Sequence, residues 1–104
     1  MNHVLDVQIE SVSDSDATKA IAMLVFLPLS QTDREKLLAL IVKNGNEYVA
    51  YWTLQDVQNI GHFRAKLLEK IVSSHNSIVA WKTLHRVADL GHFRPQLKQL
   101  AAIH

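Results

Sequence analysis

An internal repeat without gaps constrains the fold of this chain more than any other feature of the sequence. Residues 46–74 align on residues 76–104, and 11 of the 29 aligned pairs are identical. The longest identical block is the tetrapeptide Gly-His-Phe-Arg, which stands at 61–64 and again at 91–94. Self-similarity at a fixed period of this length is typical of architectures that stack one supersecondary unit several times.

A weaker first copy precedes these two by another 30 residues. Ala20 and Leu24 align with identical residues in both later copies, and Arg34 aligns with Arg64 and Arg94. The Gly-His-Phe turn is absent from this copy, as is common for a terminal unit that faces different neighbours. The sequence therefore divides into copy one (16–45), copy two (46–75) and copy three (76–104).

Each copy is predicted to begin with a short helix. In copy two, residues recur at helical spacing to form one buried stripe, at Val49, Ala50, Thr53, Leu54, Val57 and Ile60. Asn46 and Asn76 stand where an N-cap side chain accepts backbone N–H groups. Gly61 and Gly91 follow the last residue of the stripe, so we expect this helix to end with a left-handed glycine.

A second helix is predicted to complete each copy. It begins near Arg64 in copy two and near Arg94 in copy three, where Pro95 fits the first helical turn. In copy one, residues 32–35 (Thr-Asp-Arg-Glu) have the form of a capping box. Gly45 is predicted to end the second helix of that copy.

These elements predict an all-α domain over residues 16–104. Six short helices joined by short turns would stack as three antiparallel pairs, either as a short right-handed α-solenoid or as a compact bundle. Helices of 10–14 residues are marginal alone in water, so the pairs must hold one another. The pattern resembles helical-repeat proteins such as the HEAT and armadillo classes, by periodicity and without a family signature. The period of about 30 residues is shorter than theirs.

Residues 1–15 stand outside the repeat as an N-terminal extension that is extended or disordered. Leu5, Val7 and Ile9 alternate with polar residues, which is a strand pattern. Such a segment can lie over the first helix pair, pair with its symmetry mate in a dimer, or remain disordered. It carries three acidic residues and no Lys or Arg.

The overall charge gives no general attraction to nucleic acid, because the formal net charge is only +1. Copy three is locally basic, with Lys82, Arg86, Arg94 and Lys98 against Asp89. The chain contains no cysteine, so disulfides are excluded. No apolar run approaches the roughly 20 residues of a membrane span, and a secretory signal is not recognisable. We therefore expect a cytoplasmic protein without membrane contact.

The sequence contains no motif of an enzyme. Nucleophile elbows, phosphate loops and zinc-protease signatures are all absent, so we expect neither catalysis nor a cofactor. A metal site is not expected either. Equivalent residues of adjacent copies, such as His62 and His92, should lie roughly 10 Å apart, whereas zinc needs its nitrogens within about 2.1 Å of the ion.

The repeated Gly-His-Phe-Arg turn has two interpretations. In the functional one, basic residues form a ladder that binds phosphate or carboxylate groups. The candidates for anion binding are His62, Arg64, Lys82, His92, Arg94 and Lys98. In the structural one, which we favour, glycine shapes the turn and phenylalanine packs against the core. The His and Arg side chains then cap helix ends or bond to the neighbouring copy.

Aromatic residues and variable positions suggest a partner-binding surface on the first helices. Trp52 and Tyr48 are candidates for an exposed anchor patch, whereas we expect Trp81 to be buried. Chemistry also changes between copies at equivalent positions, from Gln55 to His85 and from Asp56 to Arg86. The partner-binding candidates are therefore Tyr48, Trp52, Gln55, Asp56, His85 and Arg86. Asp56 and Arg86 can alternatively form an ion pair of little energetic value.

The first helix of copy one is apolar nearly all round, with Val25, Phe26 and Leu29 at positions that are polar in the later copies. Such a helix must be covered on more than one side. Either the N-terminal residues cover it or a second chain does, which would make a homodimer through the N-terminal helix pair. The leading functional hypothesis is a protein–protein interaction module, and the alternative is nucleic-acid or polyanion binding through copy three.

Overall fold

The computed structural model describes residues 14–102 of the chain. These residues form helices and connecting loops with no strand, which confirms the prediction of an all-α fold. The first helix begins at Asp14, two residues before the expected start of copy one. The strand pattern predicted at Leu5, Val7 and Ile9 lies outside the described residues.

Six helices follow one another along the described chain. They are α2 (Asp14–Phe26), α3 (Gln31–Asn44), α4 (Glu47–Asp56), α5 (Phe63–Ser73), α6 (Ser77–Arg86) and α7 (Phe93–Ala102). Helices α4 and α6 begin 30 residues apart, and so do α5 and α7. The spacing of these elements therefore matches the spacing of the sequence copies.

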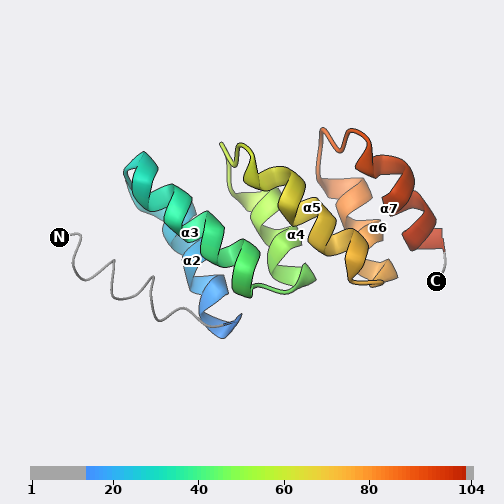
Figure 1. Ribbon diagram of the computed structural model, residues 1–104, viewed down its shortest axis with the longest axis horizontal. Coiled ribbons are helices and arrows are strands. Elements are labelled where there is room, and N and C mark those ends of the chain that lie inside the picture. Colours follow the sequence, from blue (N-terminus) through green and yellow to red (C-terminus); the bar gives the residue numbers. More distant parts are fainter. Residues whose placement is uncertain (1–13, 103–104) are drawn as a thin grey trace.

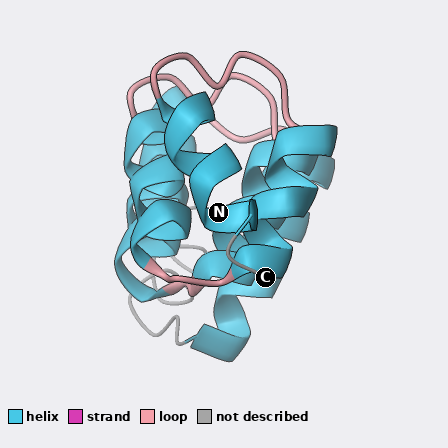
Figure 2. Ribbon diagram, turned by 90° about the vertical axis from the view of Figure 1, so that its right-hand side faces the viewer, coloured by secondary structure: helices cyan, strands magenta, loops and turns pink. Residues whose placement is uncertain are grey.

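The helices are arranged in two layers. Each pair joined by a loop within one copy packs together, as α2 with α3, α4 with α5, and α6 with α7. Between copies, α4 contacts both α2 and α6, and α5 contacts both α3 and α7. Figure 2 shows the two layers end on, with the loops gathered at the ends of the helices. The principal dimensions are 46 × 23 × 18 Å, so the molecule is elongated along the direction of stacking.

The predicted asparagine caps are confirmed. Asn46 Oδ1 accepts a hydrogen bond from the backbone N–H of Val49 at 3.0 Å, and Asn76 Oδ1 accepts one from Val79 at 3.1 Å. Both side chains thus satisfy a backbone donor that the first helical turn leaves without a partner. Inside these helices, the buried hydroxyls of Thr53 and Thr83 donate to the carbonyl oxygens four residues earlier, at 2.8 Å.

The first helices of copies two and three end earlier than predicted. They stop at Asp56 and Arg86, and the next four residues form a loop before each glycine. Gly61 has φ +64° and Gly91 has φ +56°, so the expected left-handed conformation is present, but beyond the loop rather than at the helix end. Val57 and Ile60 are buried within that loop. The apolar residues of the predicted stripe are therefore buried both in the helix and in the loop that follows it.

Two other details of the prediction are changed by the structure. The capping box expected at 32–35 is not used, because α3 begins at Gln31 and Ser30 is its N-cap. The Ser30 hydroxyl accepts from the backbone N–H of Asp33 at 3.2 Å. Gly45 does end α3, as predicted, but with φ −77°, which any residue can adopt. Glycine is therefore favoured at position 45 because a larger side chain would collide with its neighbours, not because of its backbone conformation.

One continuous hydrophobic core runs through all six helices. The largest of its fully buried apolar side chains belong mainly to the second helices: Leu37, Leu38 and Ile41 on α3, Leu67 and Ile71 on α5, and Leu97 on α7. Every described buried side-chain nitrogen or oxygen has a hydrogen-bond partner. Such a fully satisfied interior is what a unique packing of short helices requires.

We predict that Gly45→Asn destabilises the fold more than Gly61→Asn. A Cβ at position 45 would lie 2.7 Å from the Ile41 carbonyl oxygen and 2.8 Å from Val49 Cγ1, so α3 or α4 must shift. We expect this overpacking to lower the free energy of unfolding by about 1–3 kcal/mol. A Cβ at position 61 would meet no other part of the chain within 4 Å, and asparagine tolerates a left-handed backbone. Urea denaturation measures both variants, and an equal loss at the two sites would contradict this account.

Candidate functional site

The outer surface of helices α4 and α6 groups three large side chains that the core does not bury. Tyr48 and Trp52 on α4 are 40% and 41% exposed, and Ile78 on α6 is 50% exposed. Tyr48 and Ile78 occupy equivalent positions in copies two and three, on helices that contact each other. We use the name α4–α6 surface for Tyr48, Trp52 and Ile78 together with the polar residues Gln55, Asp56, His85 and Arg86.

Hydrogen bonds and ring contacts hold the aromatic residues of this surface in place. The Asn76 Nδ2 group donates to the Tyr48 hydroxyl at 3.2 Å and to Glu47 Oε2 at 3.1 Å. The rings of Tyr48 and Trp52 lie one helical turn apart, with centroids 6.4 Å apart and planes tilted by 45°. Asn76 thus caps α6 and anchors Tyr48 across the boundary between copies. Both observations indicate that contacts within the chain fix the shape of this surface.

The polar candidates belong to the same two helices. Gln55 and Asp56 are exposed on α4, and His85 and Arg86 are exposed on α6. No ion pair joins Asp56 to Arg86 in the described part of the chain. The sequence of α6 contains no acidic residue, so its exposed end, together with Lys82, is basic.

His85 is fixed by its own helix. Its Nδ1 lies 2.9 Å from the carbonyl oxygen of Trp81, and the two rings stack with centroids 4.2 Å apart. This contact fits the tautomer with the proton on Nδ1, because a carbonyl only accepts hydrogen bonds. The Nε2 atom of His85 remains for an external group.

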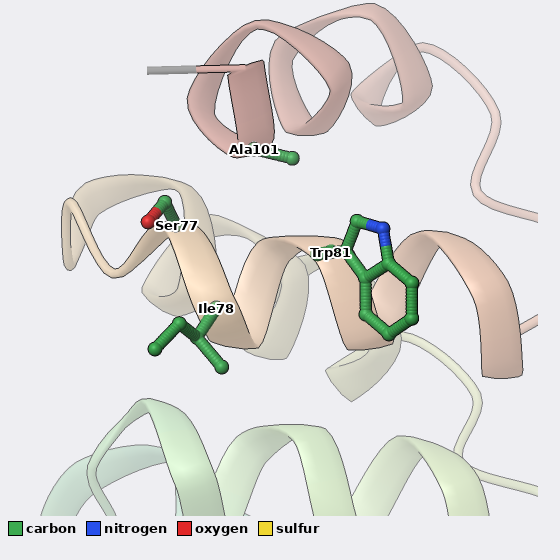
Figure 3. Close-up of a pocket in the computed structure, with 4 residues that line it drawn as sticks. All are labelled: Ser77, Ile78, Trp81 and Ala101. Atoms are coloured by element: carbon green, nitrogen blue, oxygen red, sulfur yellow. The ribbon is translucent and has the colours of Figure 1, made fainter. Parts of the chain in front are cut away.

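The expectation that Trp81 is buried is wrong. Its side chain is 52% exposed, whereas Tyr51, at the equivalent position of copy two, is only 3% exposed. Tyr51 belongs to the core, whereas no described residue covers Trp81 to the same extent. Beside it lies a hollow of about 270 Å³, lined by Ser77, Ile78, Trp81 and Ala101 (Figure 3). Sequence reasoning missed Ile78 and this hollow, because exposure of single apolar residues on a helix has no signature in the sequence.

The anion-binding candidates are only partly brought together. His62, Arg64 and His92 line a hollow of about 280 Å³ between the two Gly-His-Phe-Arg turns. Asp89 lines the same hollow, and its negative charge opposes an anion there. The remaining candidates lie outside this hollow, Lys82 on α6 and Arg94 and Lys98 on α7.

The Arg64 side chain already forms hydrogen bonds with the neighbouring copy. Its guanidinium donates to the carbonyl oxygens of Ala88 and of Asp89, the latter at 3.3 Å. Arg34 of copy one donates in the same way to the carbonyl of Gln58, the residue equivalent to Ala88. Each arginine therefore fastens its own copy to the loop of the next one. This geometry agrees with the structural interpretation of the turn.

The histidines of the turns pack on their own phenylalanines. The His62 ring stacks on Phe63 and the His92 ring on Phe93, each with centroids 4.1 Å apart. Both phenylalanines are buried, and both histidines are exposed. His62 is the N-cap residue of α5, but its side chain makes no capping hydrogen bond.

Copy one exposes a second apolar group. Phe26 is 80% exposed, Val25 is exposed, and Leu29 is only partly buried against the core. Leu27, which the sequence did not single out, is also exposed. The three residues predicted for a dimer contact thus lie at or near the surface at the end of α2.

Residues 14–102 contain no group of three or more His, Asp or Glu side chains placed to hold a metal ion. Among the same residues, no helix combines the length and the apolar character that crossing a membrane requires.

Comparisons with known proteins give no relative for this chain. No protein-family model matches the sequence, and no curated protein and no solved structure is significantly similar to it.

We predict that Arg64→Ala lowers the free energy of unfolding by about 1 kcal/mol, because it removes hydrogen bonds between copies two and three. The matched variant is Arg94→Ala, which changes the same position of copy three, where the side chain is exposed. We expect little change in stability there. Thermal and urea unfolding of the two variants provide the measurement. Equal stability of both variants and the parent chain would contradict the fastening role of Arg64.

Proposed function

We propose that this chain is a protein–protein interaction module: a short helical-repeat array, stacked as a right-handed α-solenoid, that binds its partner through the α4–α6 surface. The observation that carries the proposal is the grouping of Tyr48, Trp52 and Ile78, each 40–50% exposed, on two adjacent helices. Single exposed apolar residues are normal on a protein surface, whereas contiguous groups mark interaction sites. No catalytic role is proposed.

The energetics of this surface favour protein binding. Tryptophan and tyrosine dominate the binding energy of protein interfaces, because they bury a large area and also offer a polar group. The Asn76 bond to Tyr48 and the contact of Tyr48 with Trp52 hold both rings before binding. Less side-chain entropy is then lost on association. Gln55 and Asp56 on α4, with His85 and Arg86 on α6, form a polar rim that can select the partner.

The array itself is supported by equivalence between copies. Helices α4 and α6 share the asparagine cap and a buried threonine that bonds to its own helix. Arg34 and Arg64 repeat the same bond to a loop carbonyl of the following copy. Repeat proteins keep such internal contacts constant and vary the exposed positions, which is where they acquire specificity.

Nucleic-acid or polyanion binding is the alternative, and the placement of the basic residues argues against it. Arg64 is directed to carbonyl oxygens, and the hollow between the turns contains Asp89. A protein that contacts several phosphates should bind more weakly as salt rises. Retention of nucleic acid by the purified protein, with that salt dependence, would restore the alternative.

The test of the proposed function is partner capture with a matched pair of variants. Tagged protein is incubated with lysate of the source cells, treated with nuclease, at low and moderate salt. We expect one discrete protein partner, and we expect Trp52→Ala to weaken its binding at least about tenfold, since hot-spot truncations cost about 2 kcal/mol or more. The control is Lys66→Ala, an exposed position on α5 in the opposite layer. Equal capture by both variants would count against the surface.

Self-association through copy one is a second, separate proposal of a protein–protein contact. Phe26 is the most exposed large apolar residue of the described chain, and Val25 precedes it on α2. We expect sedimentation equilibrium to give a dimer mass for the natural chain and a monomer mass for Phe26→Ser. A monomer at every concentration of the natural chain would exclude this contact.

A further inference from the structure

The first helices of copies two and three present equivalent outer positions with different chemistry. These positions are exposed or half-buried in both copies: 48, 52, 55 and 56 on α4, and 78, 82, 85 and 86 on α6. They recur at helical spacing, so each set forms one stripe along its helix. The stripe of α4 is aromatic and polar, whereas that of α6 carries Lys82, His85 and Arg86. We call these three residues the basic cluster.

The fold does not require basic residues at these positions. His85 and Arg86 lie in the last turn of α6, where a positive charge favours the negative end of a helix. Helix α4 ends at the equivalent residue, Asp56, and has no basic residue in its last turn. Two helices of equal length, each with an asparagine cap, therefore form with opposite charges at their last residue. The basic cluster is thus not a condition for forming the helix.

The charges of the basic cluster are not neutralised within the described chain. The side chains of Lys82 and Arg86 form no hydrogen bond and no ion pair in residues 14–102. Asp56, on the neighbouring helix, lines a hollow of about 370 Å³ together with Arg34 at the boundary between copies one and two. Its carboxylate therefore lies toward copy one rather than toward α6. His85 uses Nδ1 on a carbonyl oxygen of its own helix, which leaves Nε2 for an external group.

An apolar anchor lies beside the basic cluster. Trp52 of α4 and Lys82 of α6 occupy equivalent positions on helices that contact each other, and the axes of packed helices lie about 8–10 Å apart. Trp52 is 41% exposed, and its ring centroid lies 6.4 Å from that of Tyr48, one helical turn away. Lys82 and Arg86 are also one turn apart. The α4–α6 surface therefore presents an aromatic row beside a basic row, with the same repeat.

We propose that the occupant of the α4–α6 surface is an acidic amphipathic helix of a partner protein. This inference rests on the proposed function and adds the chemistry of the partner. Aliphatic residues of the partner helix pack on Tyr48 and Trp52, as in other complexes in which a helix lies in a groove. Asp or Glu residues along the adjacent edge of that helix, one turn and about 5.4 Å apart, face Lys82 and Arg86. The Arg86 guanidinium can bind one carboxylate through two parallel hydrogen bonds.

A protein helix fits this surface better than a nucleic acid does. Surfaces that bind phosphates usually belong to strongly basic domains, whereas this chain has a formal net charge of only +1. Phosphates also repeat evenly along a strand. The bases of this surface occur on α6 alone, and Asp56 is the charged residue at the end of α4. The surface therefore matches a partner that carries its negative charge along one edge.

The experiment selects ligands for the intact chain from a displayed library of random peptides. Peptides of about 16 residues are long enough for a helix of about 24 Å. We expect the selected peptides to be enriched in Asp and Glu, beside aliphatic residues at helical spacing. A labelled synthetic copy of one such peptide is then titrated with the chain and followed by fluorescence anisotropy. Its affinity should fall severalfold as salt rises, because salt screens exposed charges, and replacing its acidic residues by glutamine should remove most of this dependence.

A matched pair of double variants makes this result specific. Lys82→Glu with Arg86→Glu should weaken binding of the acidic peptide at least about tenfold, because like charges then face each other. The control is Lys66→Glu with Lys70→Glu, which changes the net charge equally, at the same spacing, on α5 in the opposite layer. Circular dichroism confirms that both variants are folded, and Lys82→Gln with Arg86→Gln gives the effect of removing the charges alone. Equal affinity of the two reversed variants, or selected peptides without an excess of acidic residues, would overturn the proposal.

Other occupants of the surface give different results in the same assay. Displacement of the peptide by single-stranded DNA would make a nucleic acid the occupant. Self-association in sedimentation that the reversal at Lys82 and Arg86 abolishes would make a second copy the occupant. Either result would overturn the proposal.

The effect of Trp52→Ala separates this proposal from the proposed function. Peptides whose binding depends on Trp52 but not on the charges of Lys82 and Arg86 would leave the α4–α6 surface in place and exclude the acidic partner. Peptides that depend on those charges but not on Trp52 would contradict the proposed function itself, and with it the packing of the partner helix on the aromatic row.

Discussion

The packing of each helix pair against the next is the interaction on which the rest of the structure depends. Helices of 10–14 residues are marginal in water, and a single pair leaves one apolar side uncovered. Helices α4 and α5 contact α6 and α7, and Arg64 donates to the loop carbonyls of Ala88 and Asp89 in copy three. Removing a pair would therefore expose the core of its neighbour, which couples the stability of all three copies.

This mode of packing also decides which surfaces are free for function. Stacking uses the sides of the first helices that face the neighbouring copies, and the pairing within a copy uses a further side. The outer side of α4 and α6 remains, and it presents Tyr48 and Trp52 from a rigid helix rather than from a loop. In copy three, Trp81 and Arg94 are exposed, whereas their counterparts in copy two are the buried Tyr51 and the hydrogen-bonded Arg64.

Much of the fold could be predicted from the sequence, because the repeat and the caps at Asn46 and Asn76 depend on local chemistry. The end of the first helices could not, since Val57 is buried in a loop and apolar periodicity reports burial rather than conformation. The surface candidates were predicted in part: Trp52 is exposed as its position suggested. Trp81 was misjudged because its exposure depends on tertiary neighbours, which local sequence patterns do not specify.

Native-state hydrogen exchange of the intact chain tests the dependence of each pair on its neighbours most directly. The central pair, α4 and α5, is covered on both sides, whereas the outer pairs are covered by only one described neighbour. The account predicts the slowest amide exchange in α4 and α5 and faster exchange in α2, α3, α6 and α7, as in arrays with nearest-neighbour coupling. Uniform protection across the six helices, or slowest exchange in an outer pair, would contradict it.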